Sequence, residues 1–242
     1  MRKIIISVIV VCLFLFGGYK FYRHFYPRYV PLPPMPEVTI TVIPGWDLKR
    51  VAVYLAGKGF VTSTKLSADL EGYLAPNTYR VYKDATLQDV IDKLKTAREG
   101  ELKPFESVVK DSGMSEKEIL TLASIIEKEA NTQEDMAIVA DIFFRRLEQN
   151  WALQSCATVN YITGKNDPGV CASDKKIDSP YNTYKYPGLP PGPICNPGLD
   201  AIKAVLEPKK NDYNYFMTGD DGVMRYARTL EEHNLNVAKY LK

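Results

Sequence analysis

Proline and glycine are so dense between Ser179 and Gly198 that neither a helix nor a central strand can form there. Nine of these twenty residues are Pro or Gly. Proline fixes φ and lacks a backbone donor, whereas glycine adopts turns that other residues cannot. The segment also holds three tyrosines and few charges, which is atypical of a disordered linker. We predict a stiff surface loop that is either a binding site or an Ω-like loop that only covers the core.

A helix is predicted upstream of this loop. Ser115 is followed three residues later by Glu118, which is the pattern of a capping box. Beyond it, apolar residues recur at helical spacing and form one arc: Ile119, Leu122, Ala123, Ile126 and Ala130. Glu129 lies at one edge of this arc beside branched aliphatic side chains, whereas Glu127 lies near the other edge above small ones.

This position makes Glu129 a candidate general acid. Loss of hydration beside aliphatic side chains raises the pKa of a carboxyl and keeps it protonated near neutral pH, which is the state that a general acid needs. The alternative is that Glu127 and Glu129 are both solvated charges at the helix surface, as most glutamates are.

The helix belongs to a series of motifs in fixed order. They read LEGYLAPNTYRV at residues 70–81, LTLASIIEKEA at 120–130, LQS–ATVNY at 153–161, the SPYNTY and GLPPGPI–NPG blocks of the loop, and TLEEHN at 229–234. Together they resemble the YceG-like (MltG) family of endolytic murein transglycosylases, from about Val38 to the C-terminus. The resemblance implies that the second Glu of the EKE triplet, Glu129, is the catalytic residue.

The resemblance also implies a reaction. The substrate is the β-1,4 bond between MurNAc and GlcNAc in peptidoglycan strands. A single glutamate protonates the bridging oxygen and then, as a base, removes the proton of the MurNAc 6-hydroxyl, which closes on C1 to give a 1,6-anhydro end. No cofactor is needed, and cell-wall synthases are candidate partners.

Two other functions stay open. A muramidase that hydrolyses the same bond would need a second carboxyl, for which Asp174 and Asp178 are candidates. A non-catalytic peptidoglycan-binding scaffold would need neither.

Polar and aromatic side chains within the matching motifs are candidate sugar-binding groups, because they offer hydroxyls, amides and rings to sugar hydroxyls and pyranose faces. These candidates are Tyr181, Asn182, Thr183, Tyr184 and Asn196 in the loop, with Gln154 and Asn160 before it. The alternative for each is a hydrogen bond that only holds the loop in place.

Charge and metal-ligand patterns exclude other classes. Two of the 31 basic residues precede the N-terminal apolar run, so the remainder carries 29 basic residues against 29 acidic ones. This neutral balance gives no electrostatic reason to expect nucleic acid as a partner. The cysteine spacing fits no zinc-ligand pattern and the chain has only two histidines, so no metal site is predicted.

Three cysteines follow the N-terminal run, which allows at most one disulfide among them. Cys156 and Cys195 stand where the family that the chain resembles more often has Asp and Ala, and on that basis we predict that these two pair and leave Cys171 free. Pairing of Cys156 with Cys171 is the main alternative. In a reducing compartment all three would be free thiols.

Residues 4–16 are apolar apart from Ser7. This run is just adequate for a bilayer if the aromatic residues after it form an interfacial belt and Lys20 snorkels. A cleaved signal peptide is the alternative, although no A-x-A-like site follows. We predict a cytoplasmic stub at residues 1–3 and a single-pass cell-membrane anchor at 4–22. The resemblance implies that the rest of the chain is extracytoplasmic.

Beyond the anchor we predict a Pro-rich spacer at residues 23–36. Residues 37–69 form a β–turn–α unit that resembles the LysM-like, glycan-gripping part of the family, or else a small unit packed on the catalytic domain. Residues 70–242 form the catalytic domain, with helices at 87–94, 132–150 and after Thr229, and a hairpin around GDDG. The pattern indicates a helix-dominated α+β fold with small β elements, and the resemblance implies a lysozyme-like catalytic domain.

Overall fold

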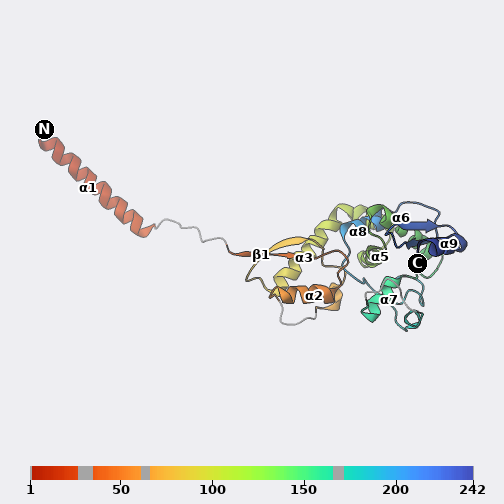
Figure 1. Ribbon diagram of the computed structural model, residues 1–242. Helices are drawn as coiled ribbons and strands as arrows, with labels where there is room; N and C mark the ends of the chain where they lie inside the picture. The colour runs from red at the N-terminus through yellow and green to blue at the C-terminus, as the bar shows by residue number, and fades with distance from the viewer. Residues whose placement is uncertain (1, 27–34, 61–65, 166–171, 242) are drawn as a thin grey trace. The chain divides into compact units, whose positions relative to one another are not determined.

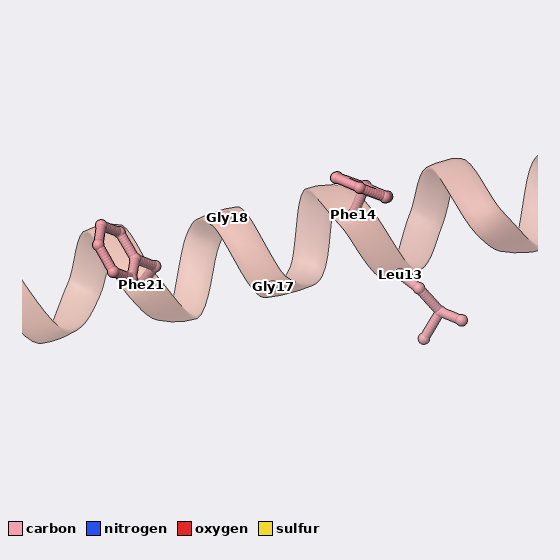
Figure 2. Close-up of a pocket in the computed structure, with 5 residues that line it drawn as sticks. All are labelled: Leu13, Phe14, Gly17, Gly18 and Phe21. Atoms are coloured by element: carbon pink, nitrogen blue, oxygen red, sulfur yellow. The ribbon is translucent and has the colours of Figure 1, made fainter.

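The computed structural model describes residues 2–26, 35–60, 66–165 and 172–241. It consists of two compact units, residues 1–36 and residues 37–242 (Figure 1). In the described part of the first unit, one long helix, α1 (Arg2–Phe25), forms. Figure 2 shows Phe14 and Phe21 on the same side of α1, with Gly17 and Gly18 between them in a shallow apolar hollow.

The prediction of a membrane anchor is wrong. Within the described residues no helix is both long enough and apolar enough to cross a membrane. The predicted span at residues 4–22 and the predicted single-pass membrane localisation therefore both fail. The physical reason is the length of the apolar run, because the 13 residues from Ile4 to Phe16 fall short of the roughly 20 that a bilayer requires. Most of the predicted spacer lies outside the described residues.

The second unit begins with a small lobe, residues 37–101. Strand β1 (Glu37–Thr41) pairs antiparallel with β2 (Thr78–Tyr82), with Glu37 opposite Tyr82. Helices α2 (Leu48–Gly57) and α3 (Leu87–Leu102) complete the lobe. Side chains from all four elements form one core: Ile40, Val42, Val51, Leu55, Leu74, Tyr79, Val81, Val90, Ile91 and Leu94.

This core does not end where the LysM-like unit was predicted to end. The strand partner of β1 and the helix α3 both come after residue 69, and their side chains are buried together with those of β1 and α2. The predicted boundary between residues 69 and 70 thus falls inside one hydrophobic core. Residues 37–69 alone would leave β1 without its hydrogen-bonding partner.

The large lobe, residues 102–241, contains most of the helices. In chain order its regular elements are α4 (Glu106–Ser112), α5 (Glu116–Glu129), α6 (Gln133–Glu148), α7 (Cys156–Thr163), α8 (Leu199–Leu206), β3 (Tyr215–Thr218), β4 (Met224–Ala227) and α9 (Leu230–Tyr240). Strands β3 and β4 form an antiparallel hairpin. Short 3-10 turns lie at Ala68–Leu70, Lys103–Phe105 and Asp174–Lys176. The fold is α+β and rich in helices, as predicted.

Helix α5 is the centre of the large lobe. It begins at the predicted capping box of Ser115 and Glu118, and residues 119–126 are buried without interruption. Helices α6 and α8 pack against α5 and against each other, and α7 contacts α5 as well (Figure 1). A helix covered on several faces is rigid, so α5 is a firm support for the side chains at its C-terminal end.

Buried polar side chains join the two lobes. Asn196, which is completely buried, accepts from the Leu74 N–H at 2.9 Å and donates to the Trp46 carbonyl at 3.0 Å. The Arg98 guanidinium, only 1% exposed, donates to the Pro197 carbonyl at 2.6 Å. Both pairs connect the small lobe to the proline-rich loop, so the loop is part of the lobe interface and not a mobile cover.

Candidate active site

Glu129 is the last residue of α5 and is half-buried. Its carboxyl accepts a hydrogen bond from the Ser155 hydroxyl and another from the Ala157 N–H. Both donors lie at the start of α7. The first N–H groups of a helix have no partner within the helix, and the helix dipole is positive at this end, so a carboxylate is favourable there. Helices α5 and α7 therefore meet at the Glu129 side chain.

Burial raises the pKa of Glu129 above its ordinary value. The hydrogen bonds from Ser155 and Ala157 and the nearby charge of Arg146 act in the opposite direction, because they stabilise the ionised form. The loss of hydration outweighs them. The carboxyl therefore keeps its proton to a higher pH than an exposed glutamate does, which is what a general acid needs.

The local backbone explains why Ser155 can reach Glu129. Ser155 is the N-cap of α7 but makes no side-chain cap of its own helix, since its hydroxyl donates to Glu129 instead. Gln154 before it has a left-handed φ of 55°, which is unfavourable for a residue with a Cβ. Its N–H donates to the Thr183 carbonyl at 3.0 Å, so the loop holds this turn in place.

Arg146 is a cation whose charge lowers the pKa of this carboxyl. It lies on α6, is 8% exposed, and donates to the Leu153 and Asn214 carbonyls at 2.5 and 2.8 Å. Its guanidinium also lies 5.6 Å from the ring of Trp151. These contacts fix the charge in the wall of the site and leave part of Trp151 facing solvent.

Glu127, the other glutamate of the triplet, has a different role. It accepts the Gly198 N–H at 2.9 Å, and Gly198 is the N-cap of α8, which has no side chain with which to cap the helix. Burial raises the pKa of Glu127 as well. The neighbouring Lys128 donates to the Gly45 carbonyl at 3.2 Å. Glu127 is thus occupied in joining α5 to α8.

Three of the predicted sugar-binding residues are buried and hydrogen-bonded internally. Asn182 donates to the Lys175 and Ile177 carbonyls at 3.0 and 2.8 Å. The Thr183 hydroxyl accepts the Ser155 N–H at 3.0 Å. Asn196 joins the lobes as described above. In the structure these three side chains hold the loop and the start of α7 in position.

The other predicted sugar-binding residues reach solvent at least in part: Gln154 is exposed, and Tyr181, Tyr184 and Asn160 are half-buried. The Tyr184 hydroxyl lies 3.0 Å from the Cys156 thiol, and the Lys175 ammonium lies 4.7 Å from the centre of the Tyr184 ring. Burial raises the pKa of Tyr184, with Cys156 and Glu129 adding to the effect. Tyr184 is therefore a neutral hydroxyl at the start of α7, within reach of the charge of Glu129.

The predicted disulfide is absent from the structure, in which Cys156 and Cys195 are both free. Cys195 is completely buried and its thiol lies 3.3 Å from the Ser124 carbonyl of α5. Cys156 contacts Tyr184 at the start of α7. In the structure the two thiols therefore contact different groups and not each other. Cys171, the alternative partner, lies outside the described residues.

Sequence patterns did not reveal Ser155, Arg146 or Trp151 as parts of the site. Ser155 stood in the LQS motif, and an N-cap search before ATVNY would have found it. Arg146 follows the helical stripe of α6 and looks like an ordinary surface charge. Among the described residues, no group of three or more His, Cys, Asp or Glu side chains is arranged to hold a metal ion.

The fold and the site thus describe a helix-rich α+β protein in which a carboxyl of raised pKa ends the central helix. The profile of the YceG-like family matches residues 29–239, and the chain belongs to this family. A crystal structure of a YceG-like protein from Listeria monocytogenes is similar, with a TM-score of 0.72 and 29% identity. The match covers 81% of this chain and 75% of the Listeria chain.

Curated relatives carry a functional name. The endolytic murein transglycosylase of Bacillus subtilis strain 168 is 39% identical over 182 residues, which are 75% of this chain and 51% of the relative. That of Streptococcus pneumoniae serotype 2 strain D39 is 38% identical over 178 residues, or 71% of this chain and 32% of the relative. The chain thus spans about half of the first relative and about a third of the second.

Proposed function

We propose that this chain is an endolytic lytic transglycosylase of peptidoglycan that cuts the β-1,4 bond between MurNAc and GlcNAc. The observation that carries the proposal is the Glu129 carboxyl, which ends the buried helix α5, has a raised pKa and is oriented by Ser155 and Ala157. The names of the Bacillus and Streptococcus relatives point to the same class of reaction.

In the proposed mechanism Glu129 acts twice. As an acid it gives its proton to the bridging oxygen, and the bond between that oxygen and C1 of MurNAc breaks. As a carboxylate it then takes the proton of the MurNAc 6-hydroxyl, whose oxygen bonds to C1 and closes the 1,6-anhydro ring. The proton count balances and Glu129 returns to its starting state. The hydrogen bonds from Ser155 and Ala157 would stabilise the carboxylate between the two steps.

The surroundings of Glu129 favour this reaction over hydrolysis, because hydrolysis needs a second carboxyl across the bond. The two aspartates considered for that role are engaged elsewhere. Asp174 pairs with Lys165 at 2.6 Å, and Asp178 pairs with Lys185 at 2.7 Å. The charged group that bears on Glu129 is instead a cation, Arg146.

The partly exposed groups near Glu129 are proposed to bind the glycan. Tyr184 lies beside the carboxyl, and Tyr181, Gln154 and Asn160 extend the surface on which sugar rings could lie. Aromatic rings offer large apolar faces with a polar edge. Asn182, Thr183 and Asn196 would act indirectly, by holding the loop. A lysozyme-like catalytic domain, a glycan-gripping small lobe and a synthase partner stay predictions.

Mass spectrometry of the products from purified peptidoglycan tests the proposal. A lytic transglycosylase gives anhydro ends, which are one water lighter than the reducing ends of a hydrolase. Anhydro products that require an intact Glu129 would support the proposal. Reducing ends would show a muramidase, and the absence of cleavage with retained glycan binding would show a scaffold.

A further inference from the structure

A second buried carboxyl, Glu71, lies at the interface between the lobes and is 7% exposed. Its two oxygens accept the same donor, the Leu48 N–H at the start of α2, at 3.1 and 3.3 Å. The Tyr161 hydroxyl of α7 donates to one of these oxygens at 3.4 Å. One carboxyl therefore contacts an element of each lobe.

The backbone beside Glu71 is held tightly. Gly72 has a φ of 87°, and a Cβ at this position would lie 2.5 Å from the Pro193 ring. Only glycine fits there, because both the conformation and the space exclude a side chain. The proline-rich loop thus presses on the residue next to Glu71 and leaves its carboxyl little freedom to move.

Tyr161 connects this carboxyl to the site. It lies in the last turns of the eight-residue helix α7, whose first turn binds Glu129. Its ring lies 5.1 Å from the ring of Tyr181 in the proline-rich loop. Hydrogen bonds from each turn to the next link the residues of a helix, so in an eight-residue helix a contact at Tyr161 also restrains the first turn, where Ser155 and Ala157 lie.

We propose that Glu71 is a positioning residue, which ties α2 to Tyr161 and so holds α7 against the carboxyl of Glu129. The inference rests on the proposed role of Glu129. Glu71 itself stays away from the reacting bond, because both of its oxygens face the Leu48 N–H and it does not rank among the groups that shift the pKa of Glu129.

The contact has a pH dependence. Burial raises the pKa of Glu71 to about 7, the charge of Asp47 adds to the rise, and the Leu48 and Tyr161 hydrogen bonds oppose it. The other ionisable groups that face Glu71 are Tyr161, Tyr181 and Cys195, and burial raises the pKa of each of them. Near neutral pH, Glu71 is therefore the group among these that changes its charge.

Ionised Glu71 only accepts hydrogen bonds, which suits both of its donors. Once protonated, one oxygen becomes a donor itself and can no longer accept equally well from Leu48 and Tyr161. The rate should therefore fall on the acid side as Glu71 gains its proton, and on the alkaline side as Glu129 loses its own. The pH–rate profile should be bell-shaped.

The test uses Tyr161→Phe and Glu71→Gln in the full chain. Tyr161→Phe removes one hydroxyl and leaves the contact of Glu71 with α2, so it keeps the proposal testable even if Glu71→Gln folds poorly. Tyr54→Phe is the matched control, because the Tyr54 hydroxyl accepts the Thr41 N–H inside the small lobe at 2.9 Å, away from α7. Steady-state rates and amide hydrogen exchange of α7 are measured for all three variants.

Tyr161→Phe should lower kcat by about tenfold with little change in KM, since a misplaced acid slows the chemical step more than binding, and it should speed the exchange of the α7 amides. Glu71→Gln keeps an amide oxygen that can accept from Leu48 and Tyr161 but no longer titrates, so it should lose the acid limb of the profile. Tyr54→Phe should change none of these.

An unchanged kcat and α7 exchange in Tyr161→Phe, or an unchanged acid limb in Glu71→Gln, would overturn the inference. The exchange measurement needs no activity, so it separates the two ideas. If the wild-type chain cleaves no glycan, the proposed function fails, while protected α7 amides that lose protection in Tyr161→Phe still support the link.

Discussion

At the residue scale, Glu127 and Glu129 show how position alone separates two identical side chains. They are two residues apart on α5, each accepts an N–H at the start of another helix, and burial raises the pKa of both. Glu127 joins α5 to α8 by accepting the N–H of Gly198. Gly198 is the N-cap of α8 and has no side chain that could cap the helix. Glu129 also accepts the Ser155 hydroxyl and has a cation, Arg146, nearby. We therefore expect the proton transfer at Glu129 and not at Glu127.

Glu129→Gln should abolish cleavage and leave the fold intact. The two side chains are nearly isosteric, but the amide cannot transfer the proton, and loss of general acid–base catalysis costs at least ~100-fold. Glu127→Gln is the matched control and should be mild, since the amide oxygen can still accept the Gly198 N–H. Glycan cleavage rates and circular dichroism of both variants check this. A dead Glu127→Gln beside an active Glu129→Gln would refute the assignment.

The activity should fall as pH rises through the pKa of Glu129. Because burial raises this pKa, the acid form persists to higher pH than for an exposed glutamate, whose pKa is about 4.3. The reaction needs that form, so the alkaline limb should lie above about pH 4.3. A profile of kcat/KM against pH measures the limb. An unchanging rate from acid to alkaline pH would contradict the raised pKa.

At the scale of elements, α7 is a helix whose start depends on a side chain from another helix. Its N-cap residue, Ser155, donates its hydroxyl to Glu129 and leaves its own helix uncapped. The Glu129 carboxyl takes the place of the missing cap by accepting the Ala157 N–H. The same hydrogen bonds therefore stabilise the start of α7 and orient the carboxyl of Glu129.

Ser155→Ala should shift the alkaline limb of the pH profile to higher pH and lower kcat. The hydroxyl lowers the pKa of Glu129 by stabilising its ionised form, so its removal raises that pKa further. Ser112→Ala is the control, because Ser112 is an exposed serine that donates to the Val109 carbonyl of α4. Kinetics of both variants over pH are compared. A limb that stays in place or moves to lower pH in Ser155→Ala would contradict the geometry.

At the scale of the whole molecule, the proline-rich loop joins the lobes and frames the site. Its far end binds the small lobe through Asn196 and Pro197, its middle presses Pro193 against Gly72, and its start supports the strained turn at Gln154. The proline-rich loop, which was expected to be stiff, thus holds together segments that are far apart in the sequence. The loop thereby places Tyr181 and Tyr184 beside α7.

Asn196→Ala should lower the free energy of unfolding by about 2–4 kcal/mol. It leaves the Leu74 N–H without its partner and weakens the hold on the Trp46 carbonyl, and each unpaired buried group costs about 1–3 kcal/mol. Asn77→Ala is the control and should change stability by less than about 0.5 kcal/mol, since the Asn77 side chain is exposed and accepts the N–H of its neighbour Thr78, while the backbone bond of Asn77 to Val42 is kept. Urea unfolding measures both. Equal losses would argue against a special role for Asn196.

The sequence by itself determined the local elements. The capping box of Ser115 and Glu118 predicted a helix that begins one residue later, as observed, and the helices predicted from residue 87 and after Thr229 begin at Leu87 and Leu230. The apolar arc predicted the buried face of α5, while the choice of Glu129 as the acid stays a prediction. These inferences succeed because caps and helical faces involve residues three or four apart, so the physical partners are also neighbours in the chain.

Only the tertiary structure decided what those elements hold together. Ser155 and Glu129 are 26 residues apart, Glu71 and Tyr161 are 90 apart, and Asn196 and Trp46 are 150 apart, so no periodicity links them. A thiol forms a disulfide only where packing brings a second thiol to it, and in the structure Cys156 and Cys195 are both free. In the same way, β1 is complete only with its partner β2, which comes from beyond residue 69.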